Sequence, residues 1–453
     1  MRTYLCVDFG STFTKALLID GDGGEVLAAT SSRTTIGTDL MDGFDACLAA
    51  LRTDHPVVDE AAVLACSSAG GGLRIAVVGQ EELVTAEAGR RVALSSGGIV
   101  VGVLAHPHAP GAWDALAAEG RPDVVLLVGG TDGGNAAPLR ASATTLAAGA
   151  WRGPVVVAGN VDVRDEIRAT LTDAGLPVVP ADNVIPRIGD LVPDSARAAV
   201  REVFLEHVIG GKALSARDGF RAMVRGATPD VVLTGVEFLA GTAGLPHGVA
   251  VVDVGGATTD VHSVVRLDAE TAELRRDVVA VTPVTRTVEG DLGMRWSAAS
   301  TARAAVVAGL APQSLLAAGE ARTADPGLLP EGDVEEEYDR SLASAASVLA
   351  VRRHAGRSRV VVSPEGRVIE RTGKNLREVD LLIGSGGIFR NLAPAEAIDV
   401  LASATGPTTE GWQQPRRPRL AIDRQHVLPA IGLLAEAEPA AAALLARTLL
   451  ADG

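Results

Sequence analysis

Short runs of apolar residues alternate with longer stretches of mixed polarity along most of the chain. The runs are rich in valine and leucine, and the stretches between them return an apolar residue at every third or fourth position. Buried strands and amphipathic helices produce these two patterns. Their alternation predicts an α/β fold. The predicted strands are Tyr4–Asp8, Ala16–Asp20, Val63–Ser67, Val124–Val128, Val155–Ala158, Val231–Thr234, Val249–Val254, Val261–Leu267 and Leu381–Ile383, and the predicted helices are Asp162–Ala174, Ser195–Val208, Arg340–Arg353 and Glu436–Leu449.

Two of the apolar runs are followed by the same short pattern. The first reads V-D-F-G-S-T-F-T-K from Val7 to Lys15, and the second reads V-D-V-G-G-A-T-T-D-V from Val252 to Val261. Both combine a strand-end aspartate, a turn of glycine and small residues, and a return strand. The recurrence predicts a duplicated core that contains two equivalent hairpins.

Such a hairpin suits a phosphate ligand, because its turn points successive backbone N–H groups into the bend. Glycine allows the phosphate to approach the backbone closely, and a lysine adds a point charge. The hairpins would bind one nucleotide from both sides. The predicted phosphate-binding residues are Gly10, Ser11, Thr12 and Lys15 in the first hairpin and Gly255, Gly256, Ala257 and Thr258 in the second.

The strand-end aspartates predict a metal. A carboxylate repels bare phosphate, but it can hold Mg²⁺ or the water molecules around it, and the metal then bridges carboxylate and phosphate. We expect Asp8 and Asp253 to hold Mg²⁺ in this way. Hydrolysis of the nucleotide also needs a positioned water molecule, and Asp260 or Thr259, which follow the second turn, could orient it.

A third glycine cluster follows the predicted strand near the C-terminus, in L-L-I-G-S-G-G-I-F-R-N from Leu381 to Asn391. A strand, a glycine turn and a helix place backbone against a flat base or a ribose. A single glycine-rich turn can equally be an ordinary tight connection, so this prediction depends on all three clusters occurring together. The predicted base- or ribose-binding residues are Gly384, Ser385, Gly386 and Gly387.

Charge and cysteine content limit the partners and the compartment. Lys and Arg number 41 against 56 Asp and Glu, and the net charge of −15 argues against binding nucleic acid or anionic lipid through the general field. The three cysteines form no C-x-x-C pair, which favours a reducing compartment and gives no support to an iron–sulfur or structural zinc site. No run approaches the ~18 apolar residues of a membrane span. We expect a cytoplasmic protein.

The three glycine clusters resemble the phosphate-1, phosphate-2 and adenosine motifs of the ATPase superfamily of actin, Hsp70-type chaperones and sugar kinases. The resemblance implies two RNase H-like subdomains around a nucleotide cleft, with ATP or ADP and Mg²⁺ as ligands. In that superfamily a glycine- and acid-containing loop often faces the nucleotide, which makes Glu289 and Asp291 candidates; the start of a surface helix is the alternative. The expected domains are 1–70 (first ATPase subdomain), 71–229 (inserted α/β region), 230–380 (second ATPase subdomain) and 381–453 (adenosine loop and C-terminal helices).

Within that superfamily, most of the chain resembles the MutL-type accessory proteins of glutamate mutase, which are unrelated to the mismatch-repair protein of that name. This resemblance implies a slow ATPase whose partner is an adenosylcobalamin-dependent mutase and which helps to eject damaged cobalamin. Homo-oligomers are compatible with it. The segments that carry the resemblance are Ile36–Gly43, Cys66–Gly79, Leu126–Asn135, Val184–Leu191, Thr287–Arg295 and Ala430–Ala435.

Other functions stay open at this point. A small-molecule kinase would use the same cleft, a hydantoinase or oxoprolinase is suggested by D-V-G-G-A-T-T-D-V, and a scaffold would bind nucleotide without turnover. Activators of acyl-CoA dehydratases are disfavoured, because they use cysteine-ligated clusters. The cobalamin motif D-x-H-x-x-G is absent, so we expect His262 to be a strand residue and not a cobalt ligand. The loop Gly129–Asn135 is either a second ligand or partner contact or part of the ATPase core.

Overall fold

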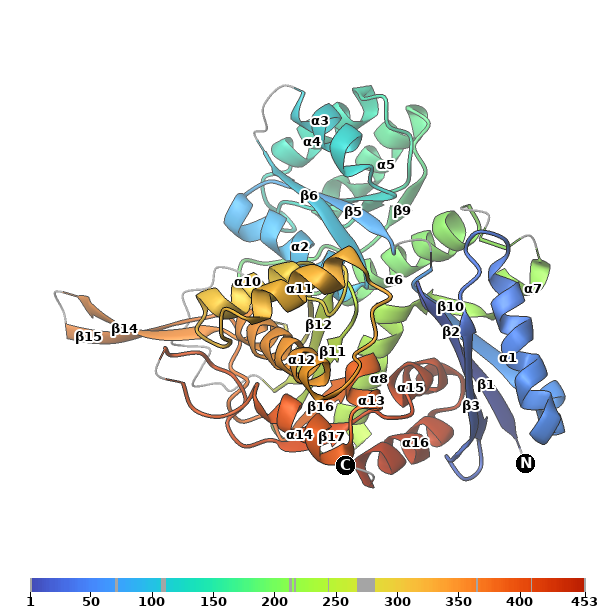
Figure 1. The fold of residues 1–453 in the computed structure, drawn as a ribbon. Coiled ribbons are helices and arrows are strands. Elements are labelled where there is room, and N and C mark those ends of the chain that lie inside the picture. Colours follow the sequence, from blue (N-terminus) through green and yellow to red (C-terminus); the bar gives the residue numbers. More distant parts are fainter. Residues whose placement is uncertain are drawn as a thin grey trace. The chain divides into compact units, whose positions relative to one another are not determined.

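The structure is a computed structural model that describes residues 2–69, 72–106, 111–211, 214–215, 217–242, 244–266, 282–363, 366–408 and 410–451. Its strands form three five-stranded sheets and one two-stranded ribbon (Figure 1). The chain divides into two compact units, and the main division falls between Val232 and Leu233. The N-terminal part is called unit 1 and the C-terminal part unit 2. Strands and helices alternate as predicted, which confirms the α/β fold.

The first sheet of unit 1 has the strand order β3-β2-β1-β4-β10. β2 is antiparallel to both β1 and β3, whereas β4 is parallel to both β1 and β10. All seven residues of the central strand β1 are buried, which explains why its sequence is a nearly continuous apolar run. The strands are β1 (Thr3–Phe9), β2 (Phe13–Asp20), β3 (Val26–Arg33), β4 (Ala62–Ser67) and β10 (Val224–Ala227).

The sheet of unit 2 repeats this topology. Its order is β13-β12-β11-β16-β17, in which β12 is antiparallel to both β11 and β13, and β16 is parallel to both β11 and β17. Strand for strand, it matches the first sheet in order and direction, and this confirms the predicted duplication of the core. The strands are β11 (Gly248–Val254), β12 (Thr259–Val265), β13 (Val284–Glu289), β16 (Leu381–Ser385) and β17 (Arg419–Ile422). Leu267, the predicted end of β12, lies outside the described residues.

A second sheet of unit 1 is inserted between β4 and β10. Its five strands are all parallel, in the order β6-β5-β7-β8-β9. This is the predicted inserted α/β region, although β10, which the sequence assigned to it, pairs with the first sheet. The strands are β5 (Arg74–Gly79), β6 (Ile99–Ala105), β7 (Val124–Leu127), β8 (Val155–Val157) and β9 (Val178–Pro180).

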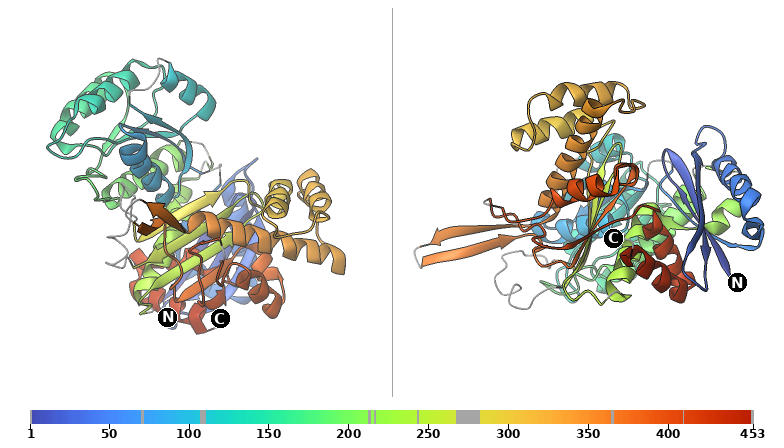
Figure 2. Two further views of the ribbon diagram at one scale, coloured as in Figure 1. Left: turned by 90° about the vertical axis from the view of Figure 1, so that its left-hand side faces the viewer. Right: turned by 60° about the horizontal axis from the view of Figure 1, so that its bottom comes forward.

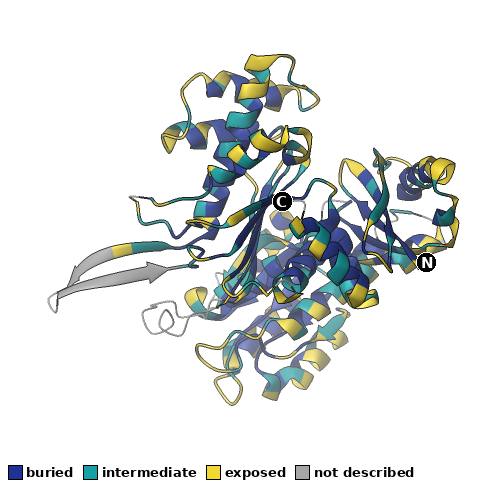
Figure 3. Ribbon diagram, turned by 90° about the horizontal axis from the view of Figure 1, so that it is seen from below, coloured by how far each residue is buried: buried dark blue, intermediate teal, exposed yellow. Residues whose placement is uncertain are grey.

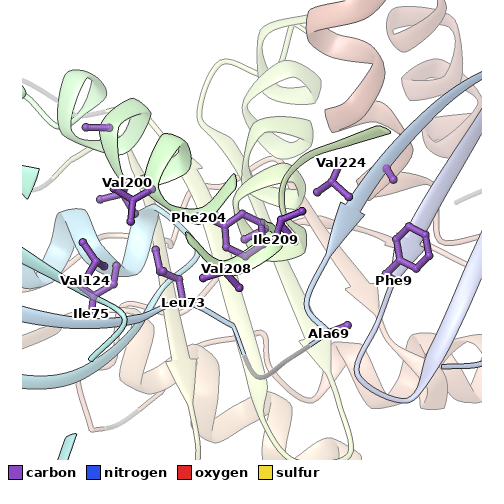
Figure 4. Close-up of a cluster of buried hydrophobic side chains, with 14 of the residues drawn as sticks. Phe9, Ala69, Leu73, Ile75, Val124, Val200, Phe204, Val208, Ile209 and Val224 are labelled. Carbon is purple, nitrogen blue, oxygen red and sulfur yellow. The ribbon is translucent and has the colours of Figure 1, made fainter. Parts of the chain in front are cut away.

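One hydrophobic core joins the two sheets of unit 1. It contains residues of β1 and β4 from the first sheet and of β5 and β7 from the second. Figure 4 shows Phe204 and Val208 between Ile75 of the second sheet and Phe9 of the first. The helices of unit 1 are α1 (Leu40–Asp54), α2 (Glu87–Ser95), α3 (Ala112–Gly120), α4 (Ala137–Ala148), α5 (Arg164–Asp173), α6 (Asp194–Val203) and α7 (Asp218–Met223), with 3₁₀ turns at Pro56–Glu60 and Val161–Val163 and π-turns at Glu82–Ala86 and Phe204–Ile209.

In unit 2 the long helix α12 packs on β11, β12 and β13. Most residues of β11 and β12 are buried, as are most of the sheet strands in Figure 3. The ribbon of β14 (Arg357–Ser363) and β15 (Gly366–Thr372) extends away from that sheet in Figure 1 and in the right-hand view of Figure 2. The helices of unit 2 are α10 (Ala298–Val307), α11 (Leu315–Ala324), α12 (Asp333–His354), α13 (Gly387–Asn391), α14 (Pro394–Ala402), α15 (Val427–Ala437) and α16 (Pro439–Ala451).

Two predicted elements differ from the structure. Val231–Thr234 was predicted as a strand, but it lies inside helix α8 (Thr228–Thr242). Val231, Val232 and Leu233 are all buried, and a helix that is buried on several sides shows no periodicity, so its short apolar run looks like a strand. The predicted helix Glu436–Leu449 is divided where Pro439 begins α16, because proline cannot donate a hydrogen bond within a helix.

Candidate functional site

The first hairpin places a buried carboxylate at the end of β1. Asp8 is 6% exposed and lies opposite Lys15 in the β1–β2 register, with the lysine Nζ 3.8 Å from the carboxylate. The hydroxyl of Thr228 donates to Asp8 at 2.6 Å. In the turn, the Gly10 N–H donates to the Phe13 carbonyl, and the predicted phosphate-binding residues Ser11 and Thr12 are exposed. The turn therefore presents small polar residues next to a fixed carboxylate.

The second hairpin has the same geometry at its turn. Asp253 is half-buried at the end of β11, and the Gly255 N–H donates to the Thr258 carbonyl, as Gly10 does to Phe13 in the first hairpin. Asp253 lies opposite Asp260 in the β11–β12 register. Two carboxylates directly opposite each other repel and destabilise a strand pair. A bound cation or a nearby basic side chain must therefore offset the repulsion between Asp253 and Asp260.

The two hairpins differ in charge at one equivalent position. Lys15 lies opposite Asp8, whereas Asp260 lies opposite Asp253. A basic residue that the sequence analysis missed is close to Asp260: Arg286 of β13, whose Nη2 is 3.3 Å from each oxygen of that carboxylate. The segment Val284–Glu289, V-T-R-T-V-E, contains few apolar residues, so it was not predicted as a strand. Nothing in the sequence therefore indicated that Arg286 lies near Asp260.

The strand register also distinguishes Asp260 from Thr259, the two residues that were predicted to orient the attacking water. Residues opposite each other in an antiparallel pair share one face of the sheet, and successive residues alternate between the faces. Asp260 therefore shares a face with Asp253, and Thr259 lies on the other face. Thr259 is fully buried, and its hydroxyl has no hydrogen-bond partner among the described residues. The geometry favours Asp260 over Thr259 for a role beside Asp253.

The Gly-Ser-Gly-Gly loop lies beside the second hairpin. Strand β16 is parallel to β11, so Ser385 is next to Asp253 at the carboxyl ends of both strands. Gly386 has φ = 103°, and a Cβ added there would lie 2.3 Å from the Val254 carbonyl oxygen and 2.9 Å from an Asp253 oxygen. Only glycine fits this position. Gly384 and Ser385 are the last residues of β16, and Gly387 is the first residue of α13. The segment therefore has the predicted order of strand, turn and helix.

The acidic turn at Glu289 and Asp291 is held by Arg353 of α12. One guanidinium nitrogen is 2.7 Å from Glu289 and 2.6 Å from Asp291, and the second is 2.9 Å from Asp291. The hydrogen bond from Arg353 lowers the pKa of Asp291, whereas burial raises the pKa of Glu289. Glu289 ends a strand and α10 begins only at Ala298, so neither acid starts a helix.

The segment after this turn braces the second hairpin. The backbone N–H groups of Met294 and Arg295 donate to the carbonyls of Gly255 and Gly256, and the Ser297 hydroxyl donates to the Ala257 carbonyl at 2.6 Å. The guanidinium of Arg295 binds Asp339 of α12 at 2.8 Å. The second hairpin, the Gly-Ser-Gly-Gly loop and the acidic turn are thus brought together in unit 2, while the first hairpin belongs to unit 1.

The loop Gly129–Asn135 lies in neither of the two matching sheets. It follows β7 of the second sheet, at the point between β5 and β7 where the strand order reverses, which is a common ligand position in parallel sheets. Asn183 holds the loop through the Gly130 carbonyl and Asp132. Gln80, at the end of β5, covers Gly129, and its Nε2 has no partner among the described residues.

No helix in the described ranges combines the length and apolar character needed to cross a membrane.

The comparisons with known proteins agree over nearly the whole chain. The family model described as MutL protein matches residues 4–450. Protein MutL of Clostridium tetanomorphum is 33% identical over 451 residues, which cover 97% of each chain.

Two solved structures are similar at low identity. A nucleotide-free acetone carboxylase has 14% identity and a TM-score of 0.41 over 96% of this chain and 70% of its own. An activator of 2-hydroxyisocaproyl-CoA dehydratase from Clostridium difficile, with bound ADPNP, has 10% identity and a TM-score of 0.32 over 100% of this chain and 98% of its own. From the family match and the 33% identical relative, the chain belongs to the MutL protein family.

Proposed function

We propose that the protein is an ATP-dependent accessory factor, a slow ATPase that maintains or reactivates an adenosylcobalamin-dependent mutase such as glutamate mutase. The observation that carries the proposal is the duplicated hairpin, in which a strand-end aspartate precedes a turn of glycine and small residues in both units. The relationship to Protein MutL and the sequence resemblance to mutase accessory proteins support the choice of partner.

We propose that the residues of both hairpins bind a magnesium–nucleotide. Asp8 and Asp253 offer the oxygen ligands that Mg²⁺ prefers, and one carboxylate from each hairpin suits a metal that keeps several water molecules. Bound Mg²⁺ would neutralise charge on the phosphates of ATP. Lys15 would bind the terminal phosphates, and the turn residues would bind phosphate oxygens through their backbone N–H groups. Gly384–Gly387 would lie against the base or ribose.

Hydrolysis needs little covalent help from the protein, because positioning and electrostatics supply nearly all of the rate. Asp260 would orient the attacking water, since it shares a face of the sheet with Asp253. The acids Glu289 and Asp291 keep the turn in place through Arg353. A slow turnover suits a factor whose ATP-bound and ADP-bound states differ in affinity for a partner.

Unit 2 contains a physical connection that could transmit the nucleotide state. Arg295 binds Gly256 of the second hairpin through its backbone and Asp339 of α12 through its side chain. Asp339 also binds the fully buried Arg322 of α11 at 2.6 Å. A shift of the hairpin would therefore act directly on the helices α11 and α12, and we propose this layer as the route to the mutase.

We place the protein in the cytoplasm. Its three cysteines are free and buried, and burial raises the pKa of Cys6 to about 12 and that of Cys47 to about 11. These thiols are therefore protonated and unreactive at neutral pH. The proposal includes no nucleic acid and no membrane partner.

The test is release of free phosphate from ATP, measured with and without a glutamate mutase that has been loaded with inactive cobalamin. We expect hydrolysis without any small-molecule acceptor, stimulation by the inactivated mutase, and recovery of mutase activity on adding ATP, Mg²⁺ and fresh adenosylcobalamin. By linkage, ATP and the mutase must change each other's affinity by the same factor.

A kinase would behave differently in the same assay. It would release little phosphate alone and would form a phosphorylated product in proportion to an added substrate. Unchanged ATPase activity and no recovery across the glutamate mutase class would defeat the assignment to a mutase. Absence of magnesium-dependent binding of both ATP and ADP in isothermal titration would defeat the nucleotide site itself.

A further inference from the structure

We propose that Arg286 is a catalytic residue of the second hairpin: its guanidinium binds the terminal phosphate of ATP and at the same time holds Asp260 in position. The inference rests on the proposed ATPase function and adds to it a residue that the hairpin motifs do not contain.

The burial of Arg286 and its incomplete hydrogen bonding are the first argument. The residue is 3% exposed, and only its Nη2 is directed at Asp260. Nε and Nη1 are buried and have no hydrogen-bond partner in the described part of the chain. A guanidinium carries five N–H donors, and leaving buried charged donors unpaired is costly. Pairing these two nitrogens with an anion would remove that cost.

The register places this cation on the side of the sheet that carries both aspartates. Arg286 lies opposite His262 in β13–β12, and Asp253 lies opposite Asp260 in β11–β12. Asp260 and His262 are two residues apart on one strand, so all four side chains share a face. Burial, followed by the charge of Arg286, lowers the pKa of His262 well below its usual range, so this histidine is neutral.

The contact between Arg286 and Asp260 is long for an ion pair that is mostly buried. The longer arginine–carboxylate pairs of unit 2, such as Arg352–Glu410 at 3.5 Å and Arg416–Glu378 at 3.9 Å, have exposed carboxylates. Three other pairs are shorter: 2.6 Å for Arg322–Asp339, 2.8 Å for Arg295–Asp339 and 2.6 Å for Arg353–Asp291. These distances are close to those of strong charge-assisted hydrogen bonds. At 3.3 Å through one nitrogen, Arg286 makes a weaker contact with Asp260 and keeps most of its donors for another group.

Hydrolysis of ATP requires N–H donors such as Nε and Nη1 of Arg286 at the transferred phosphate. The oxygen of a water molecule forms a bond to the γ-phosphorus of ATP, and the bond from that phosphorus to the β–γ bridging oxygen breaks, so ADP leaves with the electron pair. A proton of the water passes to Asp260 and then to the released phosphate. Negative charge on the transferred group is stabilised by Nε and Nη1 of Arg286, which is the role of an arginine finger supplied by the same chain.

The experiment compares the wild type with Arg286→Ala and Arg286→Lys. Arg303→Ala serves as the control, because Arg303 is an exposed arginine of α10 in the same unit. We expect Arg286→Ala to lower kcat roughly 100- to 1000-fold, as removal of a transition-state donor does, with the affinity for ADP changed less than about 3-fold. Arg286→Lys keeps the charge but not the fork of donors, and should recover only part of the rate.

A binding measurement makes the test independent of turnover. Isothermal titration with ADP and with ADPNP, which carries the terminal phosphate but is not hydrolysed, gives the preference of each variant for that phosphate. The wild-type preference for ADPNP should fall by about 10-fold or more in Arg286→Ala, as loss of a charge-assisted hydrogen bond implies. If the alanine variant does not fold, Arg286→Lys supplies the same comparison.

The outcomes separate this inference from the proposed function. A wild type that binds both nucleotides without hydrolysing ATP defeats the ATPase, and the ADPNP preference alone then decides the role of Arg286. Wild-type kcat, or an unchanged ADPNP preference, in a folded Arg286 variant overturns the inference while the ATPase stands. Addition of guanidine should partly restore activity to Arg286→Ala and not to Asp260→Ala; equal rescue of both also overturns it.

Discussion

Single residues distinguish the two hairpins more clearly than their shared pattern does. Asp8 lies opposite a lysine and accepts a hydrogen bond from Thr228, whereas Asp253 lies opposite a second carboxylate. A charge difference of this kind at equivalent positions indicates that the two copies of the hairpin have separate tasks. We propose that the first hairpin contributes the charge of Lys15 to the phosphates and that the second hairpin, which has two carboxylates, orients the attacking water.

Gly386 provides a residue-scale prediction. Gly386→Ala introduces a methyl group 2.3 Å from the Val254 carbonyl oxygen at φ = 103°, so the loop or strand β11 must shift. We expect a loss of stability of about 1–3 kcal/mol and weaker nucleotide binding, measured by urea unfolding and isothermal titration. Gly387→Ala is the matched control for the stability measurement, because a Cβ there meets no atom within 4 Å. Equal effects of both substitutions would contradict the assignment.

The sequence predicted most of the residues that the structure places around the second hairpin, because each follows a buried strand and glycine tolerates the turn conformation. It did not predict Arg286 or Arg353. Each of these acts through a contact between residues far apart in the chain, Arg286 with Asp260 and Arg353 with Asp291. Such contacts depend on strand register and helix packing, which no local pattern specifies.

At the scale of elements, α12 is attached to the sheet of unit 2 through a buried histidine. His354 ends α12, and its two ring nitrogens lie 2.7 Å from the Ser263 hydroxyl on β12 and 2.9 Å from the Thr287 hydroxyl on β13. Burial lowers the pKa of His354 well below its usual range, and Lys374 and His262 lower it further. The histidine therefore links helix and sheet in its neutral form.

This link predicts a dependence of stability on pH. The folded state keeps His354 neutral, whereas the unfolded chain binds a proton below pH ~6.5, so stability is present above that pH and is lost as the pH falls. The expected slope is about 1.4 kcal/mol per pH unit for each such histidine. It can be measured by urea unfolding between pH 7.5 and 5, using the fluorescence of Trp296 and Trp412 in unit 2 with Trp113 and Trp151 of unit 1 replaced by phenylalanine.

His354→Gln should unfold at lower urea concentration at pH 7.5 but should lose less stability on acidification. His207→Gln, at a histidine of unit 1 that is 36% exposed, should leave the slope unchanged. The same slope in wild type and His354→Gln would refute the argument.

Helix α8 shows where the prediction of elements from sequence fails. Its apolar residues point in several directions because the helix is covered on more than one side, and the period that identifies a helix is then lost. Central strands such as β1, β7 and β11 were easier to recognise, since strands that are buried on both faces read as continuous apolar runs. Other strands, such as β3 and β13, were not predicted. Strand order was not predictable, because neighbours such as β4 and β10 are far apart in the sequence.

At the scale of the whole molecule, the prediction is that a single magnesium–nucleotide uses both hairpins. Asp8→Ala and Asp253→Ala should each remove most of the ATPase activity and leave the fold intact. The double variant should be little worse than either single variant, because both residues act on one ion. The rate of phosphate release is measured for the wild type, the two single variants and the double variant, with circular dichroism as the check on folding. These rates give the coupling energy between the two substitutions.

Additive effects in that cycle would indicate two independent sites, and wild-type turnover in the double variant would place the active site elsewhere.

The sequence could suggest this arrangement only because the two hairpins share their spacing. Each aspartate is paired with the residue seven positions later, Asp8 with Lys15 and Asp253 with Asp260. A repeat that had diverged in length would have been missed.

The matching sheets have accepted additional chain at different crossings. Unit 1 has its extra sheet between the fourth and fifth strands, β4 and β10, whereas unit 2 has α10, α11, α12 and the ribbon between the third and fourth, β13 and β16. The crossing between the first two strands stayed a tight turn in both. The insertion in unit 2 is still tied to the second hairpin, because its helix α12 carries Arg353, which holds Glu289 and Asp291. We therefore expect related chains to differ in length at these two crossings and to keep the length of both hairpin turns.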